Sequence, residues 1–172
     1  YVLAKIAGLK LCEYYSKNFK LYYRTLMPCN IYGPGDTYDL KKSHFSPALI
    51  KKIYFCKKKK KKLVEIWGSG KPKREILHVD DLAEAIIFFM RKKIKEYYIN
   101  IGSGKEFSIT WYAKFIMKML NCNLKIKFNK SMPDGVKSKL IDSSKSIKYG
   151  WKPKINLNAG FQNTIKDFIR KV

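Results

Sequence analysis

Long apolar runs are absent from this 172-residue sequence, because charged residues interrupt every hydrophobic stretch. A membrane-spanning helix needs about 20 consecutive apolar residues, so none is expected and no membrane partner is predicted. The chain starts at Tyr1, and no basic segment followed by an apolar one lies near that start, so no signal peptide is expected either. These absences favour a cytoplasmic protein, and a start without methionine suggests a fragment.

Closely spaced metal ligands are also missing. The sequence has no Cys-x-x-Cys pair, and its two histidines, His44 and His78, are distant from each other. The four cysteines are equally scattered, at Cys12, Cys29, Cys56 and Cys122. This spacing predicts neither a metal site nor a disulfide framework, and it favours four buried, reduced thiols.

Acidic residues are scarce: 13 Asp and Glu stand against 37 Lys and Arg, which gives a formal net charge of +24. Such a charge is typical of proteins that bind nucleic acid. Only four of the basic residues are arginine, however, and the lysines are spread through every segment. Nucleic-acid readers usually concentrate charge on one face and use arginine forks, so a polyanion-binding module is the less favoured alternative and no specific nucleic-acid partner is expected. The run from Lys57 to Lys62 is predicted to be a solvated surface loop.

Helix and strand signals alternate along the chain, whose hydrophobic content of 46% is sufficient for a core. Apolar spacing predicts helices over residues 2–18, 46–56, 80–93, 108–120 and 158–170, with a short one after 142. Strands are expected over residues 21–27, 63–67, 75–79, 97–101 and 124–128. Pro47 is expected at the first position of its helix, and Asp80 as the N-cap of the next. This order predicts an α/β fold with a mostly parallel sheet, whose ligands bind in the loops 28–47, 67–76 and 129–139.

One pair of residues near the start is suited to carbonyl reduction. Tyr1 and Lys5 are four residues apart in a predicted helix, so they share a face. An ammonium at that distance can stabilise the phenolate left when a tyrosine gives its proton to a carbonyl that accepts hydride. The same spacing recurs at Tyr38 and Tyr54, but only Tyr1 is followed by an amphipathic helix with Ala and Gly and then by a strand.

Several ordered blocks resemble the extended short-chain dehydrogenase/reductases. They are YVLAKIAG from Tyr1, MPCNIYGPGD from Met27, and Ser43-His44 shortly before PALI from Pro47. Later blocks narrow the resemblance to members that convert GDP-4-keto-6-deoxy-D-mannose into GDP-L-fucose: WGSG from Trp67, REILHVDD from Arg74, NIG from Asn100, PDG from Pro133 and Gly150-Trp151. The resemblance extends from residue 1 to about residue 170. It implies an NADPH-dependent enzyme that epimerises C3 and C5 of this GDP-sugar and reduces C4, and it implies a homodimer.

The resemblance also implies a division of the chain. Residues 1–45 would be the end of a Rossmann-type parallel sheet that binds NADP. Residues 46–172 would form mainly a smaller α/β domain for the nucleotide-sugar, with residues 75–101 returning to the Rossmann sheet. No Gly-x-Gly-x-x-Gly turn occurs in the sequence, and the serine and cysteine that the family uses in catalysis have no match here. The chain therefore resembles a carboxyl-terminal half, which is expected to be inactive alone.

Site residues follow from the resemblance position by position. Tyr1 would be the proton donor at C4, Lys5 would hold the nicotinamide ribose, and His44 would be the acid/base of the epimerisations and would border the cofactor. Four residues would pass beside the nicotinamide: Pro28, Cys29, Asn30 and Ile31. Four others would contact the GDP-sugar: Lys52, Trp67, Arg74 and Asp134.

The sequence departs from the family at several of these positions. Lys52 stands where relatives often have arginine, which keeps the charge but loses the bidentate fork. Cys29 replaces a usual threonine, and Ser138 a residue that is often basic. His78 is predicted to be structural. A nucleotide-sugar 4-epimerase or 4,6-dehydratase would use the same Tyr1 and Lys5, and the role of His44 distinguishes it from the first interpretation.

Overall fold

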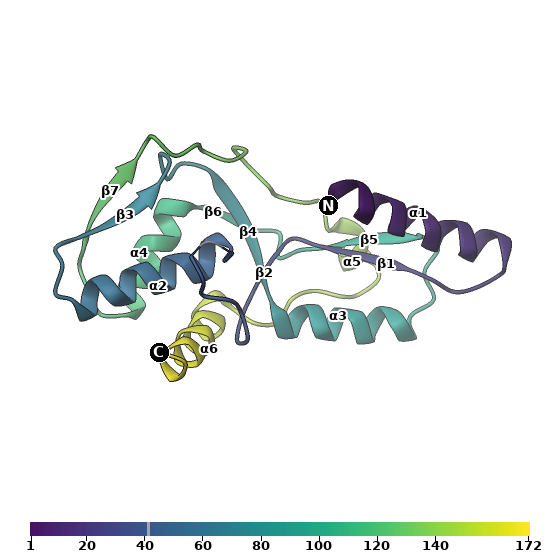
Figure 1. Cartoon of the computed structure of the whole chain (residues 1–172). Helices are drawn as coiled ribbons and strands as arrows, with labels where there is room; N and C mark the ends of the chain where they lie inside the picture. Colours follow the sequence, from purple (N-terminus) through teal and green to yellow (C-terminus); the bar gives the residue numbers. More distant parts are fainter. Residues whose placement is uncertain (41) are drawn as a thin grey trace.

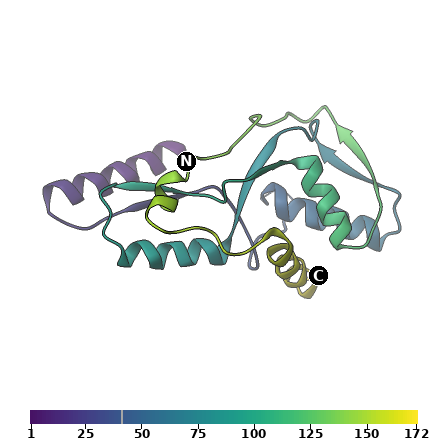
Figure 2. The same ribbon diagram turned by 180° about the vertical axis from the view of Figure 1, so that it is seen from behind.

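The computed structural model describes residues 1–40 and 42–172 and has two lobes (Figure 1). The first lobe contains the helices α1 (Val2–Asn18), α3 (Val79–Arg91) and α5 (Ser144–Lys148) with the parallel strands β1 (Thr25–Pro28) and β5 (Tyr98–Ile101). In both ribbon views α1 and α3 lie on opposite sides of the β1–β5 pair (Figures 1 and 2). The core of this lobe is built around Leu77, Phe89, Ile99, Ile101 and Trp151.

The second lobe packs two helices against another parallel pair. It comprises α2 (Phe45–Lys58), α4 (Ile109–Met119), β3 (Leu63–Trp67) and β7 (Lys125–Asn129), and α6 (Leu157–Arg170) closes it from below in Figure 1. Apolar residues at intervals of three and four put Leu49, Ile50 and Ile53 of α2 on one buried face. They share their core with Ile116 of α4 and Phe161 of α6.

Three short strands join the lobes. β2 (Asn30–Tyr32) pairs in parallel with β4 (Lys73–His78), and β6 (Glu106–Ser108) pairs antiparallel with β4. β4 passes through both cores, because Ile76 belongs to the second-lobe core and Leu77 to that of the first. β1 and β2, which are separated only by Cys29, therefore lead into the junction of the lobes, whereas the loop after β3 lies at the start of β4 in the second lobe (Figure 1).

The predicted α/β class with parallel strand pairs is confirmed. The expectation that Asp80 caps α3 is wrong. The N-cap is His78, whose Nδ1 accepts a hydrogen bond of 3.2 Å from the Asp80 backbone N–H. The His78 ring thus takes the place of the Asp80 carboxylate as the acceptor at the start of α3. His78 is only 1% exposed, which agrees with the structural role predicted for it.

Other local predictions need smaller corrections. Pro47 is the third residue of α2, because the helix begins at Phe45. α2 includes Lys57 and Lys58, so the lysine run is partly helical, although its side chains are exposed as expected. The four cysteines are partly exposed and free, where full burial was expected. No helix within residues 1–40 and 42–172 has both the length and the apolar content to cross a bilayer.

Candidate active site

The residues expected to serve the cofactor and the proton transfers line one cavity of about 780 Å³. We call it the Tyr1 cavity. All seven of them lie on its wall: Tyr1, Lys5, Pro28, Cys29, Asn30, Ile31 and His44. They come from α1, from the adjoining ends of β1 and β2, and from the residue before α2. The fold thus brings together positions that are separated by up to 43 residues in the sequence.

Tyr1 and Lys5 adopt the expected relation. The Lys5 Nζ lies 5.5 Å from the centroid of the Tyr1 ring, one helical turn away. Tyr1 is the N-cap residue of α1, and its side chain is almost fully exposed. His44 is the N-cap residue of α2 but makes no capping hydrogen bond with its side chain, so its imidazole is available to the cavity.

Cys29 and Asn30 have clear structural partners on the cavity wall. Burial raises the pKa of the Cys29 thiol to about 12, and the neighbouring charge of Glu75 acts in the same direction. The Asn30 side-chain amide donates a 2.8 Å hydrogen bond to the backbone oxygen of Glu75, which ties β2 to β4. Cys29 is consequently a protonated, unreactive thiol near neutral pH.

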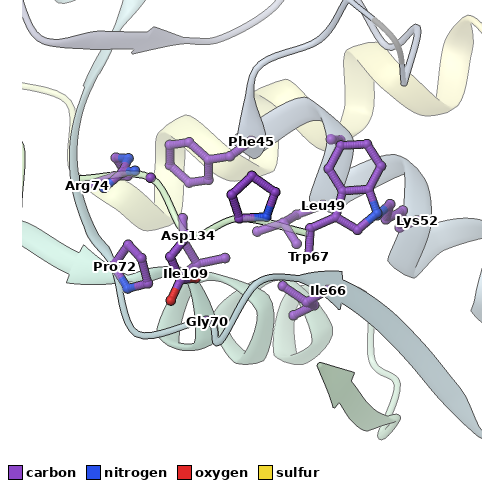
Figure 3. A pocket seen from close by; sticks show the side chains of 13 residues that line it. Phe45, Leu49, Lys52, Ile66, Trp67, Gly70, Pro72, Arg74, Ile109 and Asp134 are labelled. Atoms are coloured by element: carbon purple, nitrogen blue, oxygen red, sulfur yellow. The ribbon is translucent and has the colours of Figure 1, made fainter. Parts of the chain in front are cut away.

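The four residues expected to contact the GDP-sugar line a second cavity, of about 190 Å³. We call it the Trp67 cavity. Figure 3 shows Lys52 and Trp67 side by side at one end and Arg74 at the other, with Phe45 between them. Asp134 lies on the wall of the same cavity (Figure 3). A ligand in this cavity would have a cationic group at each end.

Lys52 is held over the Trp67 indole. Its Nζ lies 4.5 Å from the ring centroid and donates a 3.4 Å hydrogen bond to the backbone oxygen of Glu65. The ring face attracts the ammonium, which fixes the direction of a flexible side chain. Burial lowers the Lys52 pKa below that of an ordinary lysine, with the Glu65 charge opposing the shift.

Asp134 closes the cavity through Ser69. Its Oδ1 accepts 2.7 Å from the Ser69 backbone N–H, and its Oδ2 accepts 2.6 Å from the Ser69 hydroxyl. These two hydrogen bonds, led by that of the hydroxyl, hold the Asp134 pKa below its usual range. Each carboxylate oxygen can still accept a further hydrogen bond from a ligand.

Arg74 is anchored by one of its nitrogens. Nη1 donates to the backbone oxygens of Lys73, at 2.6 Å, and Val136, at 2.8 Å. The other terminal nitrogen passes close to Gly135, since a Cβ placed there would lie 2.5 Å from Nη2. Arg74 therefore joins β4 to the segment after Asp134 while it lines the cavity.

Sequence reasoning missed two residues that support this site. Ser69 was identified only as a member of the WGSG block, although it supplies both hydrogen bonds to Asp134. Glu75 is fully buried and accepts hydrogen bonds from the backbone N–H groups of Gly104, at 2.7 Å, and Ile141, at 3.0 Å. A carboxylate in the otherwise apolar end of β4 was the available signal, because a buried charge requires partners.

The two cavities are lined by consecutive residues at the start of α2. His44 lines the Tyr1 cavity, and the next residue, Phe45, lines the Trp67 cavity. Phe45, Ala48, Leu49 and Lys52 present one face of α2 to the second cavity, as their spacing requires. A ligand whose reactive end faced His44 could thus extend along α2 toward Lys52.

Known proteins resemble the chain over its whole length. The GDP-L-fucose synthase of Sinorhizobium fredii is 39% identical over 172 residues, which are 100% of this chain and 55% of that protein. A solved structure of a GDP-6-OMe-4-keto-L-xylo-heptose reductase from C. jejuni is 31% identical, with a TM-score of 0.86 over 99% of this chain and 60% of that one. The chain thus spans little more than half the length of these relatives.

Fold similarity extends to more distant proteins. A GDP-L-fucose synthetase from Naegleria fowleri bound to NADP has a TM-score of 0.90 at 23% identity, over 99% of this chain and 56% of that one. This likeness shows a shared Rossmann-like α/β architecture. In sequence, residues 1–102 match the family described as NAD dependent epimerase/dehydratase. With most of its length matched, from Tyr1 through β5, the chain belongs to the NAD dependent epimerase/dehydratase family.

Proposed function

We propose that this chain supplies the Tyr–Lys pair, the acid/base histidine and the nucleotide-sugar pocket of an NADPH-dependent epimerase/reductase. Its substrate would be GDP-4-keto-6-deoxy-D-mannose, epimerised at C3 and C5 and reduced at C4 to GDP-L-fucose. The 39% identity to a GDP-L-fucose synthase supports this choice among the GDP-sugar enzymes. The observation that carries the proposal is the adjacency of the two cavities at the start of α2.

The residues of the Tyr1 cavity fit a nicotinamide and a ketone. The cavity is open, has a volume of about 780 Å³ and is bounded by strand ends, where ligands bind in α/β folds. A bound NADPH would supply the hydride. Tyr1 would donate the proton to the C4 oxygen, Lys5 would stabilise the resulting phenolate, and His44 would remove and return protons at C3 and C5.

The Trp67 cavity would hold the nucleotide-sugar. Lys52 and Arg74, at its two ends, offer positive charge to the diphosphate, and Asp134 offers acceptor oxygens to hydroxyl groups. Trp67 keeps 51% of its surface exposed, so one ring face can contact the ligand although Lys52 approaches the indole.

The domain division belongs to the same proposal. Residues 1–45 and 75–101 would extend the nucleotide-binding sheet, and the remainder of 46–172 would form the sugar domain. The cores of the two lobes support most of this division, since β1, β5 and α3 contribute to one core, and α2, α4 and β3 to the other. Tyr149 and Trp151 depart from it, because they pack with the core of the first lobe although they belong to the remainder of 46–172. No Gly-rich phosphate turn occurs in the sequence, so the cofactor pyrophosphate would depend on residues outside this chain.

The decisive experiment separates proton exchange from reduction in an enzyme that contains this chain. His44→Gln should slow solvent-deuterium incorporation at C3 and C5 on the order of 100-fold or more while sparing hydride transfer. Tyr1→Phe is the complementary variant and should have the opposite pattern. If His44→Gln left the exchange unchanged, a 4-epimerase or 4,6-dehydratase would be favoured.

The 172-residue chain alone provides a second test. We expect no oxidation of NADPH by it, because half of the dinucleotide site and two catalytic groups are absent from its sequence. Absorbance at the reduced-nicotinamide band, with the GDP-keto-sugar present, measures this directly. Turnover by the chain alone would contradict the assignment of the missing parts.

A further inference from the structure

A third cavity, of about 820 Å³, lies between the two cores. Its wall includes Ile76 and Tyr112 from the core of the second lobe and Leu77 from the core of the first. The segment between α5 and α6 borders it, and Figure 2 shows this yellow-green segment passing below the strands from behind. We call it the interlobe cavity. It shares only Tyr32 with the Tyr1 cavity and no residue with the Trp67 cavity.

One wall of the interlobe cavity is a stack of three aromatic rings. Phe107 and Trp111 have centroids 4.0 Å apart and planes inclined by 17°, and Trp111 and Phe115 follow at 5.0 Å and 12°. Trp111 and Phe115 are four positions apart in α4 and share one face of it, and Phe107 precedes the helix in β6. All three are only partly buried and line the cavity. Trp111 is already stacked with both neighbours, so a further flat ring would contact the exposed edges of the stack or the outer faces of Phe107 and Phe115.

The mouth of the interlobe cavity is positive. Lys105 and Lys152 line it, are exposed, and form no ion pair among the residues that the structure describes. The carboxylate that lines the cavity is Asp81, which is 3% exposed and already accepts hydrogen bonds from the backbone N–H groups of Lys154 and Ile155. These hydrogen bonds leave the charge of Asp81 in place, so the two unpaired lysines face one buried carboxylate at this cavity.

α6 adds to the positive potential. Its first residues, Leu157 and Asn158, line the cavity, and its first turn has no acidic residue. The Asn156 side chain accepts from Ala159 N–H, which leaves earlier amides of this 14-residue helix without a helical acceptor. The N-terminus of a helix carries partial positive charge that favours an anion.

We propose that the interlobe cavity binds a planar aromatic anion of the nucleoside monophosphate class. The base would pack against the Phe107–Trp111–Phe115 wall, and the phosphate would lie near Lys105, Lys152 and the start of α6. An aromatic stack contributes to binding by contact with a flat ring, and the lysines and helix end by charge. Neither contribution depends on the function proposed for the other two cavities.

The experiment follows the three indole N–H signals of the chain by ¹⁵N NMR during titration with AMP. Trp111 reports on the interlobe cavity, Trp67 on the Trp67 cavity, and the buried Trp151 on the first core. Trp→Phe variants at positions 67 and 111 assign the signals. We expect a saturable shift of the Trp111 signal. Adenosine, which lacks the charge, and ribose 5-phosphate, which lacks the ring, should each bind about tenfold more weakly.

A pair of charge variants completes the test. Lys105→Gln with Lys152→Gln should weaken AMP binding about tenfold, since two exposed ionic contacts with the phosphate are lost. Lys130→Gln with Lys139→Gln removes the same charge from exposed positions outside the cavity and should leave the affinity unchanged. An unmoved Trp111 signal, a shift confined to Trp67, or equal weakening by both pairs would overturn the proposal.

Discussion

At the scale of single residues, the burial of Lys52 lowers its pKa and so makes ligand binding dependent on pH. Because its pKa lies below that of an ordinary lysine, its charge is present below that lowered value and is lost as the pH rises through it. Arginine stays charged over this range. We therefore expect GDP affinity, measured by calorimetry, to decline at lower pH in the native chain than in Lys52→Arg. Identical alkaline profiles would contradict a contact between Lys52 and the diphosphate.

The Asp134–Ser69 contact predicts an acid-sensitive loop. Since the Asp134 pKa is lowered in the folded chain, the contact stabilises the fold above the ordinary carboxyl pKa and is lost as the pH falls through the lowered value. Ser69→Ala removes the hydroxyl donor and should raise the Asp134 pKa toward the ordinary value of about 3.9. Carboxyl ¹³C NMR measures the shift, and an unchanged Asp134 titration would contradict the hydrogen-bonded geometry.

The residues that line the two cavities could be predicted from the sequence, but the residues that hold them in place by hydrogen bonds could not. Ordered motifs led to the walls of the Tyr1 and Trp67 cavities, because such motifs preserve positions that meet only after folding. The roles of those residues stay predictions. Ser69 and Glu75 were missed as supports, because their partners lie 65 and 66 residues away in the chain and leave no local pattern.

At the scale of elements, α6 packs closely against β2 at a glycine. A Cβ on Gly160 would lie 2.1 Å from the Tyr32 hydroxyl oxygen and 3.0 Å from the His78 ring. Both rings are buried and cannot move aside freely. Gly160→Ala should therefore lower the free energy of unfolding by about 1–3 kcal/mol through overpacking.

Gly8 in α1 is the matched control for Gly160. Nothing lies within 4 Å of a Cβ at Gly8, so alanine there should only improve helix propensity, by up to about 1 kcal/mol. Urea denaturation of both variants measures the contrast. If Gly160→Ala were as stable as Gly8→Ala, the close approach of α6 to β2 would be refuted.

Most helices were predictable because their apolar spacing repeats over several turns, as in α2, α4 and α6. The short strands β2 and β6 were missed, because each has three residues that are extended by pairing with β4 and have no pattern of their own. β2 lies in the stretch 28–47 that was predicted to be a loop. The first strand was predicted from residue 21 but begins at Thr25. β-rich composition before Thr25 indicated strand, but that stretch has no partner strand in the described fold.

At the scale of the whole molecule, α1 leaves most of its apolar residues in contact with solvent. Val2, Leu3, Ile6 and Leu11 are each more than half exposed, and Ser16 is the only buried residue of the helix. A patch of this kind on a surface helix is typical of an interface. Together with the homodimer implied by the family resemblance, it predicts self-association through α1.

Sedimentation velocity tests this prediction. Leu3→Lys with Leu11→Lys should shift the chain toward the monomer by placing charges in the contact. Leu63→Lys with Ile169→Lys alters two side chains of the second lobe, 46% and 43% exposed, and should leave the association unchanged. A native chain that stays monomeric at high concentration would contradict the prediction.

Tyr32 borders both the Tyr1 cavity and the interlobe cavity, and its ring stacks on Phe161 at 4.9 Å and meets His78 edge-on at 5.3 Å. Any replacement of Tyr32 therefore changes the shape of both cavities at once. It also alters the packing of α6, because Phe161 belongs to that helix. A substitution of Tyr32 that alters one cavity would preserve the other only if neighbouring residues also changed. Homologues that have lost this tyrosine should accordingly also differ at the positions of Phe161, Gly160 or His78.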